Sequence, residues 1–294
     1  MSKTVAWIGL GVMGEPMAGH LLAAGHTLRV HTRTKEKAAR LIESGAEWCE
    51  TPKEAAAGSS FVFSIVGYPS DVEEVILGEA GALAGAEPGA TLVEMTTSEP
   101  ALAQRIHVEA AAKGVGALDA PVSGGDLGAR NASLAIMVGG DRETFETALP
   151  LLQVLGENVS HFGAAGAGQR VKMSNQILIA STMIGVIESL LYATRAGLDM
   201  DEVIDLIGSG AAGCWSINNL GRRIAKDDYA PGFFIKHFVK DMGIALRDSS
   251  AMGIELPGLA LAKEFYDRAV VEGLENDGTQ GLYKVFAEMN SPSS

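Results

Sequence analysis

A lysine and an asparagine three positions apart are the residues best suited to proton-transfer chemistry. Lys172 and Asn175 lie in the stretch Gly166-Ala-Gly-Gln-Arg-Val-Lys-Met-Ser-Asn175, at the start of a long apolar segment. On a helix this spacing places both side chains on one face. An ammonium group there can protonate the alkoxide that hydride reduction leaves on a carbonyl and can stabilise its charge. A lysine that merely reaches the surface from a first helical turn is the alternative interpretation.

A second stretch combines a serine with two glycines. Asp119-Ala-Pro-Val-Ser123-Gly124-Gly125 follows an expected strand, where an open α/β sheet presents its ligand crevice. The two glycines leave backbone N–H groups uncovered, so together with the Ser123 hydroxyl they can hold a carboxylate in a nest of amides. An ordinary turn of small residues is the alternative.

A glycine-rich hexapeptide near the start of the chain has the spacing of a dinucleotide-binding loop. It follows the first expected strand, opens a helix, and consists of Gly9, Leu10, Gly11, Val12, Met13 and Gly14. In this context the first glycine allows a tight turn, the second lets the backbone approach a pyrophosphate, and the third lets helix and strand pack closely. The helix N-terminus then supplies unpaired N–H groups to the anion. The alternative is a glycine-rich turn without a ligand.

The end of the second expected strand bears on which nicotinamide cofactor the loop would hold. A carboxylate there accepts the ribose 2′-OH of NAD, whereas a basic group suits the 2′-phosphate of NADP. Here the strand runs into Thr32, Arg33 and Thr34 without an acid. Because a guanidinium can bind a phosphate in a bidentate manner, the sequence favours NADP(H), with NAD(H) as the alternative. If Arg33 is only a solvated surface residue, this preference disappears.

Alternating strands and helices in the first half of the chain would position these residues. Short apolar runs rich in β-forming residues predict strands at Val5–Gly9, Thr27–His31, Phe61–Val66, Thr91–Met95, Gly116–Ala120, Ala135–Val138 and Val159–Phe162. Apolar residues at helical spacing predict helices at Met13–Ala24, Lys35–Ser44, Ser70–Leu77, Ala101–Lys113 and Arg142–Leu155. This alternation is typical of a Rossmann-type, doubly wound α/β sheet, which we assign to residues 1–164.

The remainder, residues 165–294, is predicted to be an all-α domain. Gln169–Ala196 has the pattern of one long helix, apolar round most of its surface and ended by Gly197. We expect such a helix to be buried in a bundle and to offer surface to another subunit, which predicts a homodimer or homotetramer. Asp199 and Glu202 indicate the start of the next helix. Later helices are expected at Ser216–Ala225, Lys236–Met252 and Leu256–Glu272.

The composition of the 294-residue chain argues against several kinds of partner. A net charge of −13 without a Lys/Arg-rich block would repel nucleic acid and an anionic membrane surface. No run approaches about 18 consecutive apolar residues and no export signal is apparent, so we expect a cytoplasmic protein without a membrane partner. Cys49, Cys214 and the six histidines lack metal-ligand spacing. No metal site is therefore predicted, and both cysteines are expected to be small buried side chains.

Four motifs, taken in order, resemble those of the β-hydroxyacid dehydrogenase family, which includes 3-hydroxyisobutyrate dehydrogenase, tartronate semialdehyde reductase and the glyoxylate and succinic semialdehyde reductases. They span nearly the whole chain: the hexapeptide from Gly9, the stretch from Asp119 to Gly125, the stretch from Gly166 to Gln176, and the pair Lys240-Asp241. The resemblance implies a Rossmann-type domain followed by an all-α domain. It also implies an NAD(P)-dependent dehydrogenase or reductase that acts on the CH–OH group of a small hydroxy acid.

The resemblance further implies roles for individual residues. Lys172 would be the acid/base, supported in catalysis by Asn175 and Ser123. The residues implied in holding the substrate are Ser123, Gly124, Gly125, Asn175, Phe233 and Asp241. The residues implied near the cofactor, beyond the glycine-rich loop, are Val66, Gly67, Tyr68, Thr97 and Lys240. Relatives that use NADP often carry Asn-Arg-Thr where this chain has Thr32-Arg33-Thr34, so the arginine and the second threonine are retained.

The sequence determines the substrate less closely. Cys214 and Trp215 would make part of a pocket wall apolar, which favours a short acid over a sugar phosphate, although Trp215 as core filling is the alternative. 6-Phosphogluconate dehydrogenase shares the early motifs, but its helical domain is far larger than residues 165–294. Imine reductases have the same plan but usually lack a lysine at the position of Lys172. A protein that binds NADPH without turnover would have no need of this proton donor.

Overall fold

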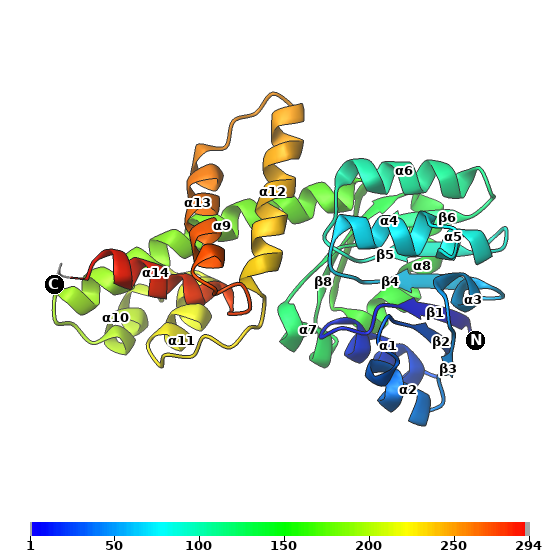
Figure 1. Cartoon of the computed structure of the whole chain (residues 1–294), viewed down its shortest axis with the longest axis horizontal. Helices are drawn as coiled ribbons and strands as arrows, with labels where there is room; N and C mark the ends of the chain where they lie inside the picture. The colour runs from blue at the N-terminus through cyan, green and yellow to red at the C-terminus, as the bar shows by residue number, and fades with distance from the viewer. Residues whose placement is uncertain (1, 292–294) are drawn as a thin grey trace. The chain divides into compact units, whose positions relative to one another are not determined.

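The computed structural model describes residues 2–291, and the chain divides into two compact units between Lys172 and Met173. In Figure 1 the first unit holds all the strands, and the second is made of helices, from green to red. The predicted order of a Rossmann-type sheet followed by an all-α part is confirmed. The division falls inside a helix, and the predicted domain boundary after residue 164 stays a prediction.

The first unit is built on a nine-stranded sheet of order β3-β2-β1-β4-β5-β6-β8-β7, with β9 beside β8. The strands are β1 Thr4–Ile8, β2 Thr27–His31, β3 Glu47–Trp48, β4 Phe61–Ser64, β5 Thr91–Glu94, β6 Gly116–Asp119, β7 Val122–Ser123, β8 Ala135–Gly140 and β9 Asn158–Gly163. Neighbours from β3 to β6 are parallel, whereas β8 is antiparallel to β6 and to β7. The order from β3 to β6 is that of dinucleotide-binding sheets, which hold their ligand where the winding reverses, between β1 and β4.

Helices cover both faces of this sheet because successive strand residues point to opposite sides. In β1, Val5 and Trp7 join a core with α1, α2 and α8, whereas Ala6 and Ile8 join a core with α3 to α6. The helices of this unit are α1 Gly14–Ala23, the 3-10 helix η1 Lys35–Ala38, α2 Ala39–Glu43, α3 Pro52–Ala56, α4 Pro69–Leu77, α5 Ala82–Gly85, α6 Pro100–Ala111, α7 Gly125–Asn131 and α8 Arg142–Leu155.

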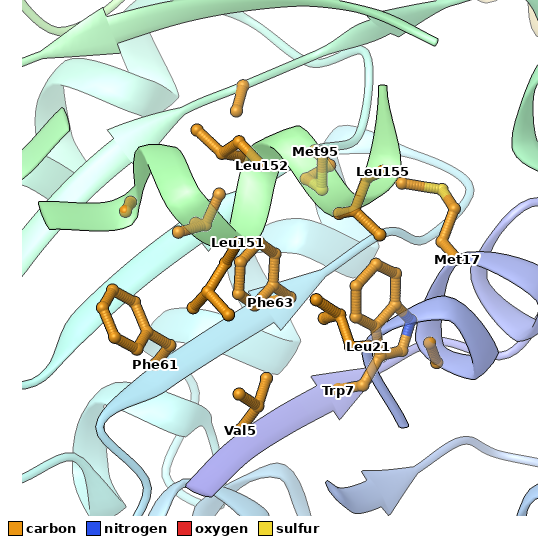
Figure 2. Close-up of a cluster of buried hydrophobic side chains, with 14 of the residues drawn as sticks. Val5, Trp7, Met17, Leu21, Phe61, Phe63, Met95, Leu151, Leu152 and Leu155 are labelled. Carbon is orange, nitrogen blue, oxygen red and sulfur yellow. The ribbon is translucent and has the colours of Figure 1, made fainter. Parts of the chain in front are cut away.

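The core on the α1 and α8 side (Figure 2) is joined to the glycine-rich loop through Trp7. Trp7 of β1 stacks on Phe63 of β4 with ring centroids 5.4 Å apart. The indole Nε1 of Trp7 donates to the carbonyl oxygen of Gly9 at 3.0 Å. A buried tryptophan N–H needs such a partner, so core packing and loop conformation are set together.

The shortest elements escape prediction from the sequence. The strands β3 and β7, of two residues each, and the helices α3, α5 and α7 are absent from the predicted elements. Each is too short for hydrophobic periodicity to give a signal. The helix Leu282–Met289 near the end of the chain is also absent from the predicted elements. The predicted helix Lys35–Ser44 is in fact η1 followed by α2. Cys49 is buried as predicted, whereas Cys214 is only half-buried.

The second unit packs helices around one apolar core. They are α9 Ala167–Arg195, α10 Met200–Ile207, the π-helix η2 Ser216–Gly221, α11 Arg222–Ile224, α12 Ile235–Ala251, α13 Pro257–Val271, the 3-10 helix η3 Thr279–Gly281 and α14 Leu282–Met289. The Asp199 carboxylate accepts from the N–H of Glu202 at 2.9 Å and so caps α10, as the sequence predicts. The buried Tyr266 hydroxyl donates to the carbonyl oxygen of Thr279 at 2.9 Å.

Helix α9 is less buried in a single chain than its composition predicts. Met183 and Leu190 lie in the core of the second unit, but Leu178 is 70% exposed and Tyr192 76% exposed. By length and composition α9 meets the criterion for a membrane-crossing helix, which the core helix of a soluble protein also meets; 33% of its most apolar window is buried. Apolar residues therefore occupy more of this helix than one chain covers.

Candidate active site

Close backbone contacts hold the glycine-rich loop between β1 and α1. Gly9 has a φ of +93°, and a Cβ there would lie 2.1 Å from the carbonyl oxygen of Ile65. A Cβ on Gly14 would lie 2.0 Å from the carbonyl oxygen of Gly9, so only glycine lets α1 begin this close to β1. A Cβ on Gly11 would meet no heavy atom within 4 Å. The backbone at Gly11 therefore faces open space. The other loop residues are, from buried to exposed, Leu10, Met13 and Val12.

Arg33 follows β2 at the carboxyl edge of the sheet, with 80% of its side chain exposed. Its Nη1 lies 3.3 Å from Oδ1 of Asp71, near the start of α4. An exposed ion pair of this kind holds a side chain only weakly. Thr32 is half-buried and Thr34 is exposed. The strand thus ends in an exposed guanidinium flanked by two threonine hydroxyl groups.

The loops that follow β4 and β5 are joined by a hydrogen bond. The backbone N–H of Val66 donates to Oγ1 of Thr96 at 2.9 Å. Gly67 and Thr97 are half-buried in these two loops, and Tyr68 is exposed. Because β1, β4 and β5 are parallel neighbours, both loops lie at the same edge of the sheet as the glycine-rich loop.

The serine and two glycines of the second motif lie where β7 gives way to α7. Ser123 ends β7 and is half-buried. The φ angles of +130° at Gly124 and +62° at Gly125 fall in a region that L side chains rarely adopt. This backbone conformation therefore requires both glycines.

The carboxylate of Asp119 accepts hydrogen bonds from the backbone at the start of α9. Its Oδ1 accepts from the N–H of Gly166 at 2.8 Å, and its Oδ2 accepts from the N–H of Gln169 at 2.9 Å. Asp119 ends β6 and is only 3% exposed. Burial raises the pKa of this carboxyl above its usual range, and the N–H groups of Gly166 and Gln169 oppose that rise. Asp119 thus caps α9 and ties it to the sheet.

Gln169 connects the same helix to the loop after β5. Its Oε1 accepts from the N–H of Ser98 at 2.9 Å, and its Nε2 donates to the carbonyl oxygen of Thr96 at 2.8 Å. Lys172 follows one turn farther along α9 and is 7% exposed. Through Asp119 and Gln169, the position of Lys172 is set by β6 and by the loop after β5.

Small residues let α9 begin this close to the sheet. A Cβ on Gly168 would lie 2.3 Å from the carbonyl oxygen of Met137 in β8, and one on Gly139 would lie 2.5 Å from Oδ1 of Asp119.

The sequence did not predict a role for Asp119 or for Gln169. The features that could have indicated these roles are an acid, Asp119, at the end of an apolar strand and an amide, Gln169, just after Gly166 and Gly168.

In the second unit, Asn175 belongs to a line of polar side chains. Its Nδ2 donates to Oε1 of Gln176 at 2.8 Å, and Nε2 of Gln176 donates to Oδ2 of Asp241 at 2.7 Å. Nζ of Lys240 lies 3.0 Å from Oδ1 of Asp241. The structure therefore joins Asn175, Asp241 and Lys240, three residues singled out in the sequence, through Gln176, which was not.

The aromatic residues predicted to border the substrate, Phe233 and Trp215, also belong to the second unit. Phe233, half-buried before α12, packs edge-on against Phe238 with ring centroids 5.8 Å apart. Trp215 is 67% exposed, so its interpretation as core filling is wrong. A place for Trp215 and the half-buried Cys214 in a pocket wall stays a prediction.

Two family models together match most of the chain. The one described as the NAD binding domain of 6-phosphogluconate dehydrogenase matches residues 4–163, and the one described as NAD-binding of NADP-dependent 3-hydroxyisobutyrate dehydrogenase matches residues 166–286. The chain belongs to the β-hydroxyacid dehydrogenase family. It is thus an NAD(P)-dependent oxidoreductase, and the open backbone at Gly11 and the strand order fit such a cofactor.

Individual relatives match over most of their length. An uncharacterized oxidoreductase of Bacillus subtilis is 51% identical over 98% of this chain and 100% of its own. A probable 3-hydroxyisobutyrate dehydrogenase-like protein of Arabidopsis thaliana is 48% identical over 98% of this chain and 86% of its own. The structure of Mycobacterium tuberculosis 3-hydroxyisobutyrate dehydrogenase with L-serine superposes with a TM-score of 0.89 at 30% identity, over 97% of this chain and 99% of the other.

Proposed function

We propose that this chain transfers a hydride between NADP(H) and a small β-hydroxy acid or its semialdehyde, with Lys172 as general acid and base. The observation that carries the proposal is the placement of Lys172. It is a buried lysine one turn into a helix whose start is bonded to β6 and to the loop after β5. The sheet that holds this helix start also carries the glycine-rich loop. One framework thus positions a buried lysine and the glycine-rich loop.

The preference for NADP(H) over NAD(H) rests on Arg33. A guanidinium at the end of β2, in an exposed ion pair with Asp71, can turn to a 2′-phosphate and bind it in a bidentate manner. The hydroxyls of Thr32 and Thr34 flank it and can add hydrogen bonds to the same group. Tyr68, Thr97 and Lys240 stay predicted cofactor contacts.

The substrate class rests on the turn from Ser123 to Gly125. Successive N–H groups in a positive-φ backbone, next to a serine hydroxyl, suit a carboxylate. Relatives are named for 3-hydroxyisobutyrate, 2-hydroxy-3-oxopropionate and L-serine, all small acids with a hydroxyl or an oxo group. We propose a substrate of the same kind. Phe233, Asp241 and Trp215 stay predicted substrate contacts in the second unit.

Proton transfer follows from the chemistry of lysine. Bound NADPH would supply the hydride to the carbonyl carbon of the semialdehyde. Lys172 then donates a proton from Nζ to the carbonyl oxygen, which becomes the hydroxyl, and in oxidation its neutral amine takes that proton back. Burial of Lys172 strengthens its attraction for the negative oxygen because little water screens it. Asn175, three residues farther along α9, is proposed to orient the substrate.

We also propose that the chain works as a cytoplasmic homodimer or homotetramer of two-domain subunits, divided after residue 164. The exposed apolar side chains of Leu178 and Tyr192 on α9 support self-association, since such side chains gain by burial against a partner. Sedimentation equilibrium of the purified protein, compared with the variant Leu178→Glu, measures the number of subunits.

The proposed chemistry is tested by NADPH and NADH consumption with glyoxylate, succinic semialdehyde, methylmalonate semialdehyde and tartronate semialdehyde. We expect turnover of at least one of these, and we expect Lys172→Ala to lower kcat by about a hundredfold or more, the scale of a general acid. Lys172→Arg is the matched control because it keeps the charge but does not release its proton near neutral pH. Both variants should bind NADPH as the wild type does.

Other outcomes would point to the alternatives. Wild-type turnover by Lys172→Arg would refute proton transfer by Lys172 and leave it a purely electrostatic role. Reduction of a cyclic imine, added to the panel, without reduction of any semialdehyde would favour an imine reductase. Saturable NADPH binding with no turnover of acid or imine would favour a binding protein.

A further inference from the structure

Three side chains of the second unit form a continuous line of hydrogen bonds that ends on Asn175. Oδ2 of Asp241 accepts from Nε2 of Gln176 at 2.7 Å, and Oε1 of Gln176 accepts from Nδ2 of Asn175 at 2.8 Å. Asp241 and Gln176 are both buried, so bulk water does not compete for these bonds. Nζ of Lys240, 3.0 Å from Oδ1 of Asp241, supplies the opposite charge that a buried carboxylate needs.

The chemistry of these groups gives the line a direction. A carboxylate accepts hydrogen bonds and donates none. Gln176 must therefore present its NH2 group to Asp241, which turns its carbonyl oxygen toward Asn175. That oxygen accepts only from an N–H group, so Asn175 must present its NH2 group in turn. An amide without such a partner can turn over and present either end.

We propose that Asp241 and Gln176 are positioning residues that fix which end of the Asn175 amide faces the substrate. The inference rests on the proposed function, in which Asn175 orients the acid. With its NH2 group bonded to Gln176, Asn175 offers Oδ1 as an acceptor in one fixed place. A hydroxyl on the substrate can donate to that oxygen, and an analogue without the hydroxyl leaves it unpaired, which is a basis for discrimination.

Exchanging the carboxylate and the amide tests the positioning role. Asp241→Asn can present either a donor or an acceptor to Gln176, so the amide of Asn175 is no longer fixed, and kcat/KM for the hydroxy acid should fall about tenfold. Gln176→Glu alone places a second carboxylate against that of Asp241, and its kcat/KM should fall further than that of Asp241→Asn. In the double variant, the carboxylate introduced at position 176 accepts from both neighbours. Its kcat/KM should return to within about threefold of the wild type.

Replacement by leucine separates positioning from stability. Gln280 is a matched control for Gln176, because it is also buried in the second unit and donates to the carbonyl oxygens of Asp228 and Ala230. Gln176→Leu and Gln280→Leu should both lower Tm, but only Gln176→Leu should lower kcat/KM, by about tenfold. Equal losses of activity in the two, or a double variant that does not recover, would overturn the positioning role.

A neutron crystal structure of the deuterated protein tests the line of hydrogen bonds from Asp241 to Asn175 independently of any activity measurement. Deuterium on Nδ2 of Asn175 should point to Oε1 of Gln176 in the wild type, and both amide orientations should appear in Asp241→Asn. If the wild type turns over no acid but shows this orientation, the proposed function is refuted and the fixed orientation of Asn175 still stands. The opposite orientation of the Asn175 amide in the wild type would overturn the positioning role, whatever the activity of the protein.

Discussion

Replacing Asp119 by alanine measures how far the start of α9 depends on one carboxylate. The change removes the acceptor of two backbone N–H groups, at 2.8 and 2.9 Å, from a site that is 3% exposed. Each buried donor left unpaired costs about 1–3 kcal/mol, and a helix cap lost to alanine costs about 0.5–2 kcal/mol. We therefore expect the free energy of unfolding to fall by about 3 kcal/mol, out of roughly 5–15 kcal/mol for an ordinary domain.

Urea unfolding followed by tryptophan fluorescence can measure this loss in the first unit alone. Trp7 and Trp48 lie in that unit and Trp215 in the second, so a Trp215→Phe background leaves only the first unit visible. Asp141→Ala is the matched control, because Asp141 stands at the N-cap of α8 without making a capping hydrogen bond, and we expect a change within about 0.5 kcal/mol. Equal losses in Asp119→Ala and Asp141→Ala would refute the capping role.

The same pair of proteins tests the pKa of Asp119. Burial raises this pKa above its ordinary value of 3.8, against the pull of the backbone N–H groups, so the folded state holds a proton at pH values where the unfolded state has lost it. The contribution of this carboxyl to stability is then full below 3.8 and falls as pH rises through the raised value. The stability gap between wild type and Asp119→Ala should be wider at about pH 4 than at about pH 8. A gap that widens toward alkaline pH would mean that hydrogen bonding outweighs burial.

Four further variants probe the choice of cofactor, the glycine-rich loop and the core of the second unit. Arg33→Asp should raise the Kd for NADPH about tenfold or more and leave that for NADH nearly unchanged, as fluorescence titration can show. Gly14→Ala, whose methyl group would lie 2.0 Å from the carbonyl oxygen of Gly9, should lose both Tm and NADPH binding, whereas Gly11→Ala should keep its Tm and lose binding only. Tyr266→Phe leaves a buried carbonyl without its donor and should cost about 1–2 kcal/mol of unfolding free energy in urea titration.

Features set by local patterning could be predicted from the sequence. The alternating faces of β1 and the close approach of Gly14 to Gly9 act within one strand-turn-helix unit, so the spacing from Gly9 to Gly14 is visible without any structure, whereas the crowding of Gly9 by Ile65 is not. The Asp199 cap of α10 is equally local, since its partner Glu202 is three residues away. Composition alone, however, overstated the burial of α9, because it does not say which apolar side chains a single chain covers.

Features that depend on distant residues could not be predicted in the same way. The bonds that Asp119 and Asp241 accept come from residues 50 and 65 positions away, at Gln169 and Gln176. Such contacts leave no periodic signal, because they depend on which elements the fold brings together. Trp215 shows the same limit, since a large aromatic residue gives no local sign that it is exposed.

Helix α9 runs through the division between the two units, with Lys172 on one side and Asn175 on the other. A flexible linker absorbs a change of length, but a continuous helix converts it into rotation. One residue inserted between Lys172 and Asn175 would turn Asn175 about the axis of α9 by about 100° relative to Lys172 and advance it by about 1.5 Å. Insertions of about seven or about eleven residues, close to two or three full turns, approximately restore the angle. The number of residues between Lys172 and Asn175, rather than their identity, therefore keeps the two side chains on one face of α9.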